Sequence, residues 1–172
     1  MRLALLLRGV NLGGSRKLAM ADLRALLADL GHTEVKTLMA SGQAIVATER
    51  PPAEVAAELE TRLLADVGLR TDVMVRSGAE LSAIVAANPF PTADADGSRH
   101  AVVFLREPLE VQIDAAEYAP DELVAHGTEL YLRLPNGFAD SKLSIAVGKV
   151  KGSPATTRNW NTVKKLEVLT NP

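Results

Sequence analysis

The feature that most constrains this chain is the order in which strand-like and helix-like apolar patterns alternate through its first half. Residues 3–7 form an apolar run typical of a buried central strand, and the leucines between 23 and 30 recur with helical spacing. Later patterns predict strands over 34–39, 43–48 and 69–75, a helix from Pro51 to Gly68, and a short helix capped by Ser77. The order β-α-β-β-α-β predicts a ferredoxin-like unit.

The second half repeats much of this order. Strand patterns cover 101–105, 123–125 and 129–134, and helices are expected over 108–117, after Ser141 and over 157–169, with no evident closing strand. We therefore predict an α+β protein of two ferredoxin-like halves related by internal structural duplication. The expected division is a first half over 1–88, a proline-containing linker loop over 89–98, and a second half over 99–172 that includes the C-terminal helix.

The residue types that are missing narrow the chemistry. The 172 residues include no cysteine, which excludes disulfides, zinc–cysteine and iron–sulfur sites, and a cysteine nucleophile. The three histidines have no partner at metal-ligand spacing, so we expect no metal, and no cofactor is indicated. No apolar run approaches the roughly 20 residues of a membrane span, and no signal peptide is evident. We expect a cytoplasmic protein that does not enter a membrane.

The charge pattern is uneven although the formal net charge is only −2. Residues 141–166 contain six basic side chains and no acidic one. This can produce one positive surface within a nearly neutral protein, although solvated lysines would give the same count. The net charge and the 3% of aromatic residues do not favour nucleic acid as a partner.

The first candidate site is the loop that follows the first strand. Its glycines and basic residues could bind an anion through backbone amides and guanidinium groups, although it lacks the G-x-x-x-x-G-K-[ST] pattern of a phosphate loop. A tight turn that needs positive φ would also explain the glycines. The candidate ligand-binding residues here are Arg8, Asn11, Gly13, Gly14 and Lys17.

The second candidate site is the expected start of the C-terminal helix. We predict Thr157 as its N-cap and Trp160 as a core residue, with Arg158 and Asn161 on an adjoining polar face that could bind a phosphate or carboxylate. Simple solvent exposure of that face is the alternative. The remaining candidate ligand-binding residues are Asn159 beside this site, Lys142, and Ser41 and Gln43 in the turn before the third strand.

Several segments spread over nearly the whole chain carry a family resemblance. They are residues 5–14, 20–27, 87–91 and 156–166, with 118–122, 135–138 and 141–143 between them. Together they resemble one bacterial family, the domain-of-unknown-function family 1697. The resemblance implies an α+β fold of two ferredoxin-like parts and carries no established activity. Two departures are visible: the turn Ala40-Ser-Gly-Gln43 replaces the usual Gln-Ser-Gly-Asn, and the segment between Ser141 and Thr156 is one residue short.

These observations lead to one main functional hypothesis and two alternatives. The main hypothesis is a binding module for a small anionic ligand, a nucleotide or phosphorylated metabolite, held in one cleft by Arg8 and Arg158 with their neighbours. The first alternative is a transferase-like enzyme that acts on such a ligand, and the sequence leaves open whether the protein is an enzyme. The second is an RNA- or protein-interaction module. The oligomeric state is not indicated.

Overall fold

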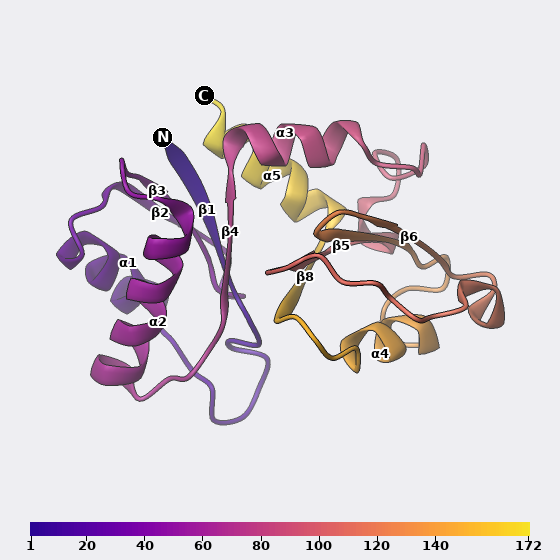
Figure 1. Ribbon diagram of the computed structural model, residues 1–172, viewed down its shortest axis with the longest axis horizontal. Helices are drawn as coiled ribbons and strands as arrows, with labels where there is room; N and C mark the ends of the chain where they lie inside the picture. Colours follow the sequence, from indigo (N-terminus) through magenta and orange to yellow (C-terminus); the bar gives the residue numbers. More distant parts are fainter. The chain divides into compact units, whose positions relative to one another are not determined.

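The computed structural model describes all 172 residues and divides into two compact units (Figure 1). The first unit comprises Met1–Ser82 and Leu166–Pro172, and the second comprises Ala83–Lys165. The expected linker loop, 89–98, therefore lies inside the second unit, and the last seven residues belong to the first. No helix is long and apolar enough to span a lipid bilayer.

The first unit has the predicted ferredoxin-like topology. Its sheet has the strand order β2-β3-β1-β4, and all neighbouring strands are antiparallel. Helices α1 and α2 lie together on one face of this sheet (Figure 1). The elements are β1 (Arg2–Leu7), α1 (Met20–Asp29), β2 (Thr33–Leu38), β3 (Gln43–Ala47), α2 (Pro52–Val67) and β4 (Val73–Ser77).

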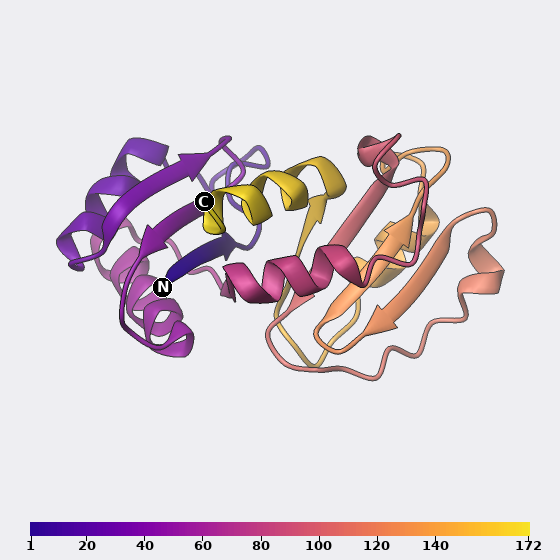
Figure 2. The ribbon, with the colours of Figure 1, turned by 90° about the horizontal axis from the view of Figure 1, so that it is seen from above.

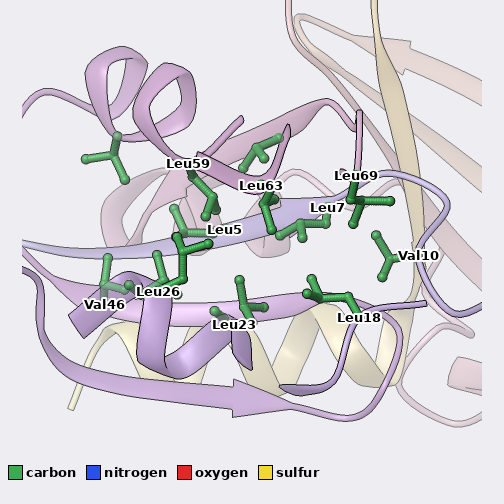
Figure 3. Close-up of a cluster of buried hydrophobic side chains, with 14 of the residues drawn as sticks. Leu5, Leu7, Val10, Leu18, Leu23, Leu26, Val46, Leu59, Leu63 and Leu69 are labelled. Carbon is green, nitrogen blue, oxygen red and sulfur yellow. The ribbon is translucent and has the colours of Figure 1, made fainter. Parts of the chain in front are cut away.

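Alternate residues of β1 build the core of the first unit. Leu3, Leu5 and Leu7 belong to the core that α1 and α2 cover, and none of the three is exposed. Figure 3 shows Leu5 and Leu7 in this core. The helices contribute side chains at helical spacing, among them Leu23 and Leu59. Ala4 and Leu6, on the opposite face, are also fully buried, which explains why β1 is apolar along nearly its whole length.

The second unit repeats the same strand order with different coverage. Its sheet is β6-β7-β5-β8, again antiparallel throughout, and β8 is an edge strand (Figure 2). A helix follows the last strand of each sheet: α3 (Gly78–Ala86) follows β4, and α5 (Trp160–Thr170) follows β8. The elements of the second sheet and its connections are η1 (Gly97–Arg99), β5 (His100–Leu105), η2 (Ala115–Tyr118), β6 (Glu122–His126), β7 (Glu129–Arg133), α4 (Lys142–Gly148) and β8 (Ala155–Asn159).

The predicted C-terminal helix begins three residues too early. Residues 155–159 form β8, the closing strand that the sequence patterns did not indicate, and the helix starts at Trp160. Within β8, Thr156 and Arg158 are buried and Thr157 is exposed, which is the alternation of a strand. Two adjacent β-branched threonines favour that conformation. Thr157 is therefore not a helix cap.

The helix predicted over 108–117 is also wrong. Residues 107–114 are not helical, and only a 3-10 turn, η2, follows. Leu109, Val111 and Ile113 are two residues apart and pack together against the core of the second unit. A spacing of two places these side chains on one side of an extended segment rather than on one face of a helix.

Candidate functional site

The first candidate loop is held in place by the side chain of Asn11. Its Oδ1 accepts from the backbone N–H of Leu18 at 2.8 Å, and its Nδ2 donates to the carbonyls of Leu18 at 2.8 Å and Ala40 at 2.7 Å. Both amide hydrogens are therefore used within the protein. Gly13 and Gly14 have φ values of 91° and 94°, as a tight turn that needs positive φ predicts, and Asn11 also has a positive φ, of 56°.

The turn before β3 lies next to this loop, at the same edge of the sheet. The Nδ2 of Asn11 contacts Ala40, and the N–H of Leu7 donates to the carbonyl of Gly42 at 2.8 Å. A Cβ on Gly42 would lie 3.1 Å from that of Leu7, so the close approach requires glycine. Ser41 and the buried Gln43 hydrogen-bond to each other through their side chains.

A pocket of about 580 Å³ opens in the first unit where β1 ends and β4 begins. Antiparallel pairing of these strands brings residues 70–72 beside Arg8, and α2 supplies a further wall. Its lining combines three arginines and two carboxylates with hydroxyl groups and one leucine. The lining residues are Arg8, Gly9, Arg16, Glu60, Thr61, Leu64, Arg70, Thr71 and Asp72.

The three arginines of the pocket are held in different ways. The Nη1 of Arg8 lies 3.3 Å from Oδ2 of Asp72, and the Arg8 side chain is 50% exposed, so solvent screens this ion pair. Arg16 uses Nη2 to bind the carbonyl of Arg70 at 2.7 Å and that of Arg8 at 3.3 Å. The side chain of Arg70 is exposed and makes no hydrogen bond or ion pair.

Backbone contacts fix the position of these groups. The N–H of Arg8 donates to the carbonyl of Asp72 at 3.0 Å, and the hydroxyl of Thr71 donates to the carbonyl of Arg8 at 2.8 Å. One carboxylate oxygen of Glu60 accepts from the N–H of Val73 at 2.7 Å. The pocket therefore presents guanidinium groups from a rigid framework.

Several of these residues were absent from the sequence-based candidates. Arg16, Arg70, Thr71 and Asp72 were not among the proposed ligand-binding residues. The signal that could have found them is the predicted topology itself. In a ferredoxin-like sheet the first and last strands are antiparallel neighbours, so the residues after one strand lie beside those that precede the other. Lys17, which was proposed, is exposed and does not line the pocket.

Arg158 lies in β8 and is buried rather than on an exposed helix face. Its Nη1 donates to Oγ1 of Thr156 at 2.7 Å and to the carbonyl of Thr157 at 2.8 Å. Burial lowers the pKa of Arg158 to about 10. Asn161 is exposed and lies on α5, so the expected common helical face of these two residues is wrong.

The other candidates of the second unit have structural roles or are exposed. Oδ1 of Asn159 accepts from the N–H of Thr162 at 2.9 Å, so Asn159 caps α5. Lys142 is exposed at the start of α4, whose N-cap is Ser141. Trp160 is 3% exposed and donates from Nε1 to Asp94 at 2.8 Å, which confirms that it is a core residue.

The candidate residues therefore fall into two groups. Arg8 and the loop that follows it belong to the first unit, whereas Lys142, Arg158, Asn159 and Asn161 belong to the second. A cleft common to both groups stays a prediction. The pocket of the first unit is the part of the candidate site for which the geometry is defined.

The fold defines the class of this protein as an α+β protein built from two ferredoxin-like halves. The sequence profile of the family described as "Protein of unknown function (DUF1697)" matches residues 1–131, and the chain belongs to that family. The conserved bacterial protein SP0830 from Streptococcus pneumoniae has a similar structure, with a TM-score of 0.79 and 24% sequence identity over 99% of this chain and 98% of that chain. No curated protein matches the chain.

Proposed function

We propose that this protein is a binding module for a small anionic ligand, a nucleotide or a phosphorylated metabolite, and that the anion binds in the arginine-lined pocket of the first unit. The observation that carries the proposal is the pocket of about 580 Å³ that Arg8, Arg16 and Arg70 line together. Its volume falls within the range of roughly 300–1,000 Å³ that is usual for small-molecule sites.

The three arginines would have different roles in binding the anion, because their contacts within the protein differ. Arg16 stabilises the pocket wall because its guanidinium bridges two backbone carbonyls. Arg70, which has no protein partner, would supply a bidentate contact to a phosphate. Arg8 would turn from its single, solvent-screened contact with Asp72 toward the ligand. The hydroxyl group of Thr61 and the side chain of Leu64 would contact the rest of the ligand.

The test is isothermal titration calorimetry with inorganic phosphate, pyrophosphate, AMP and ATP as probes. Arg70→Gln should weaken binding of the best probe about tenfold or more, because a hydrogen bond to a charged group contributes about 1.5–3 kcal/mol. Arg62→Gln is the matched control, since Arg62 is on α2 but pairs with Asp66 outside the pocket. The control should bind as the unmodified protein does.

Two results would refute the proposal. One is the absence of measurable binding for all four probes at millimolar concentration. The other is equal affinity of Arg70→Gln and Arg62→Gln. We also propose a cytoplasmic location, which is supported by the sequence without cysteine.

A further inference from the structure

The edge strands β4 and β8 occupy equivalent places in their sheets, each beside the first strand of its half. Arg76 of β4 pairs with Ala4, and Arg158 of β8 pairs with Val102. Ala4 is the third residue of β1, and Val102 is the third residue of β5. The two arginines are therefore equivalent. Each also donates from Nη1 to the carbonyl of the preceding residue, at 2.9 Å in β4 and 2.8 Å in β8.

This equivalence identifies the backbone groups that point away from each sheet. Arg8 donates its N–H to Asp72, and Arg106 donates its N–H to Pro154, which fixes the hydrogen-bonded pairs along both edges. Because such pairs alternate in an antiparallel ladder, every second residue directs its N–H outward. The outward residues are Val73, Val75 and Ser77 in β4, and Ala155, Thr157 and Asn159 in β8.

Carboxylates close the edge of β4. The outward N–H of Val73 donates to Oε1 of Glu60 at 2.7 Å, and that of Ser77 donates to Oε2 of Glu80 at 2.7 Å. These contacts occupy donors that could otherwise pair with another strand. The second unit lacks an equivalent arrangement. No acceptor in the protein binds the outward N–H groups of Ala155, Thr157 and Asn159.

A pocket of about 350 Å³ lies beside the open edge of β8. Leu132, Phe138 and Val147 give it apolar walls, and Thr157 and Asn159 of β8 line it at the strand. The pocket occurs where the side chains of the second unit fill the space over the sheet less completely than those of the first unit do. The covering helix α4 has seven residues against sixteen in α2, and Ala101 occupies the position that Leu3 has in the first sheet.

The charge around this edge favours an acidic partner. Residues 141–166 include α4 and β8 and carry six basic side chains without an acidic one. Among them, Lys142, Lys149 and Lys151 are exposed and form no ion pair. Pairing of two copies of this chain through β8 would bring these lysines together, and like charges at an interface oppose association.

We propose that the open edge of β8 binds an extended peptide segment of a partner protein as an added antiparallel strand. The outward N–H groups of Thr157 and Asn159 donate to the backbone of the peptide, and one apolar side chain of the peptide fills the pocket beside α4. Acidic residues that flank this side chain contact the lysines of α4 and of the segment that follows it. This inference is independent of the anion site in the first unit.

The experiment is selection of a displayed random library of peptides about nine residues long, a usual strand length, on the purified full-length protein. Selected peptides should combine an apolar central residue with aspartate or glutamate on its flanks. Their affinity is then measured by fluorescence anisotropy. In hydrogen exchange, the amides of Thr157 and Asn159 should exchange more slowly when a selected peptide is bound.

Two variants test the geometry. Thr157→Pro removes one outward donor at an edge position that tolerates proline, and it should weaken the selected peptides about tenfold. Thr157→Val retains the N–H at the same position and is the conservative comparison, which should lose much less affinity than Thr157→Pro. Ala101→Leu places in the second sheet the residue that the first sheet has. Ala101 lies between Leu132 and Asn159, which both line the pocket, so the larger side chain should narrow the pocket and weaken binding without removing any donor.

Three results would overturn the inference. The first is that no peptide is enriched. The second is that selected peptides bind Thr157→Pro and Ala101→Leu, each folded by circular dichroism, as tightly as Thr157→Val. The third is a dimer in analytical ultracentrifugation that Thr157→Pro dissociates, which would identify a second copy of the chain as the occupant. Anion binding in the first unit should be unchanged in all three variants.

Discussion

The two units share one strand order, but they differ in how their sheets are covered and in what their pockets contain. In the first unit, the sixteen-residue α2 covers the sheet, and the pocket lies beyond the strand ends, among arginines and carboxylates. In the second, the seven-residue α4 leaves a mostly apolar pocket against the sheet, without a charged side chain in its lining.

This difference shows that the two sheets share a backbone arrangement, whereas side chains at a few positions determine the chemistry of each surface. Arg76 and Arg158 are equivalent and make the same contact with the preceding carbonyl. Ser77 and Asn159 are equivalent as well, yet only Ser77 is followed by a glutamate that binds its N–H. At this position a carboxylate occupies the outward N–H of β4, whereas the equivalent N–H of β8 has no acceptor.

The largest expected effect compares the two cores at equivalent positions. Leu5 and Val103 are both buried residues of a first strand. Leu5→Ala should lower the free energy of unfolding of the first unit by about 2–5 kcal/mol, and Val103→Ala should lower that of the second by about 2 kcal/mol, since fewer methyl groups are lost. Urea denaturation measures both values. A larger cost at Val103 would mean that the second core is the better packed one.

The next largest effect compares the turn between β2 and β3 with the equivalent turn between β6 and β7. Gly42 has a φ of 79°, and a Cβ there would lie 3.1 Å and 3.2 Å from the Cβ atoms of Leu7 and Val10. Gly127 has a φ of 60° with only a side-chain oxygen of Glu129 at 4.0 Å. Gly42→Ala should therefore cost about 2–3 kcal/mol, and Gly127→Ala only the left-handed strain of about 1–2 kcal/mol. Equal losses of thermal stability would refute the close-approach argument.

The sequence predicted the first unit more accurately than the second, and the reason is physical. The leucines of β1, α1 and α2 face a well-filled core, so their spacing follows the geometry of each element closely. In the second unit, Leu109, Val111 and Ile113 pack against the core from an extended segment, and the helix predicted over 108–117 does not form.

The candidate site was predicted only in part. Arg8 is a single residue next to an apolar strand, and its position there already required a polar partner or a ligand. Arg70 and Asp72 reach the same pocket only because β4 pairs antiparallel with β1, a contact across more than sixty residues. Periodicity within a short window carries no information about such a contact. β8 was missed for a related reason, because its pairing with β5 lends it a stability that its own five residues do not reveal.

The pH dependence of stability should contain a contribution from the buried His32. Burial, and secondarily the Arg50 guanidinium, lowers the pKa of His32 below 6.5, against a smaller opposing effect of Glu58, and Nε2 of His32 has no hydrogen-bond partner. His100 instead has Asp96 and Thr92 as partners of its two ring nitrogens.

The unfolded chain takes up a proton at His32 as the pH falls through 6.5, and the folded chain does so only at lower pH. The stability of the first unit should therefore be complete above pH 6.5 and should decrease on acidification, by at most about 1.4 kcal/mol per pH unit from this group. His32→Leu should remove this contribution, whereas His126→Leu, at an exposed position, should not. Denaturant midpoints between pH 8 and pH 5 measure it, and parallel curves for the two variants would contradict the assignment.

The smallest expected effect comes from removing one of the two carboxylates that close the edge of β4. Oε2 of Glu80 accepts from the N–H and the hydroxyl of Ser77 at 2.7 and 2.8 Å, while the N–H of Glu80 donates back to that hydroxyl at 3.2 Å. Glu80→Ala removes the two carboxylate contacts of this capping box and should cost about 1 kcal/mol, measured by thermal denaturation.

The same variant sharpens the comparison of the two strand edges. Glu80→Ala leaves the N–H of Val73 bound to Glu60, so the edge of β4 stays closed at its other end. A peptide selected on β8 should therefore bind Glu80→Ala with unchanged affinity and one-to-one stoichiometry. A second equivalent of peptide bound by Glu80→Ala would mean that the carboxylate alone separates the two edges, and that the pocket beside α4 contributes nothing to recognition.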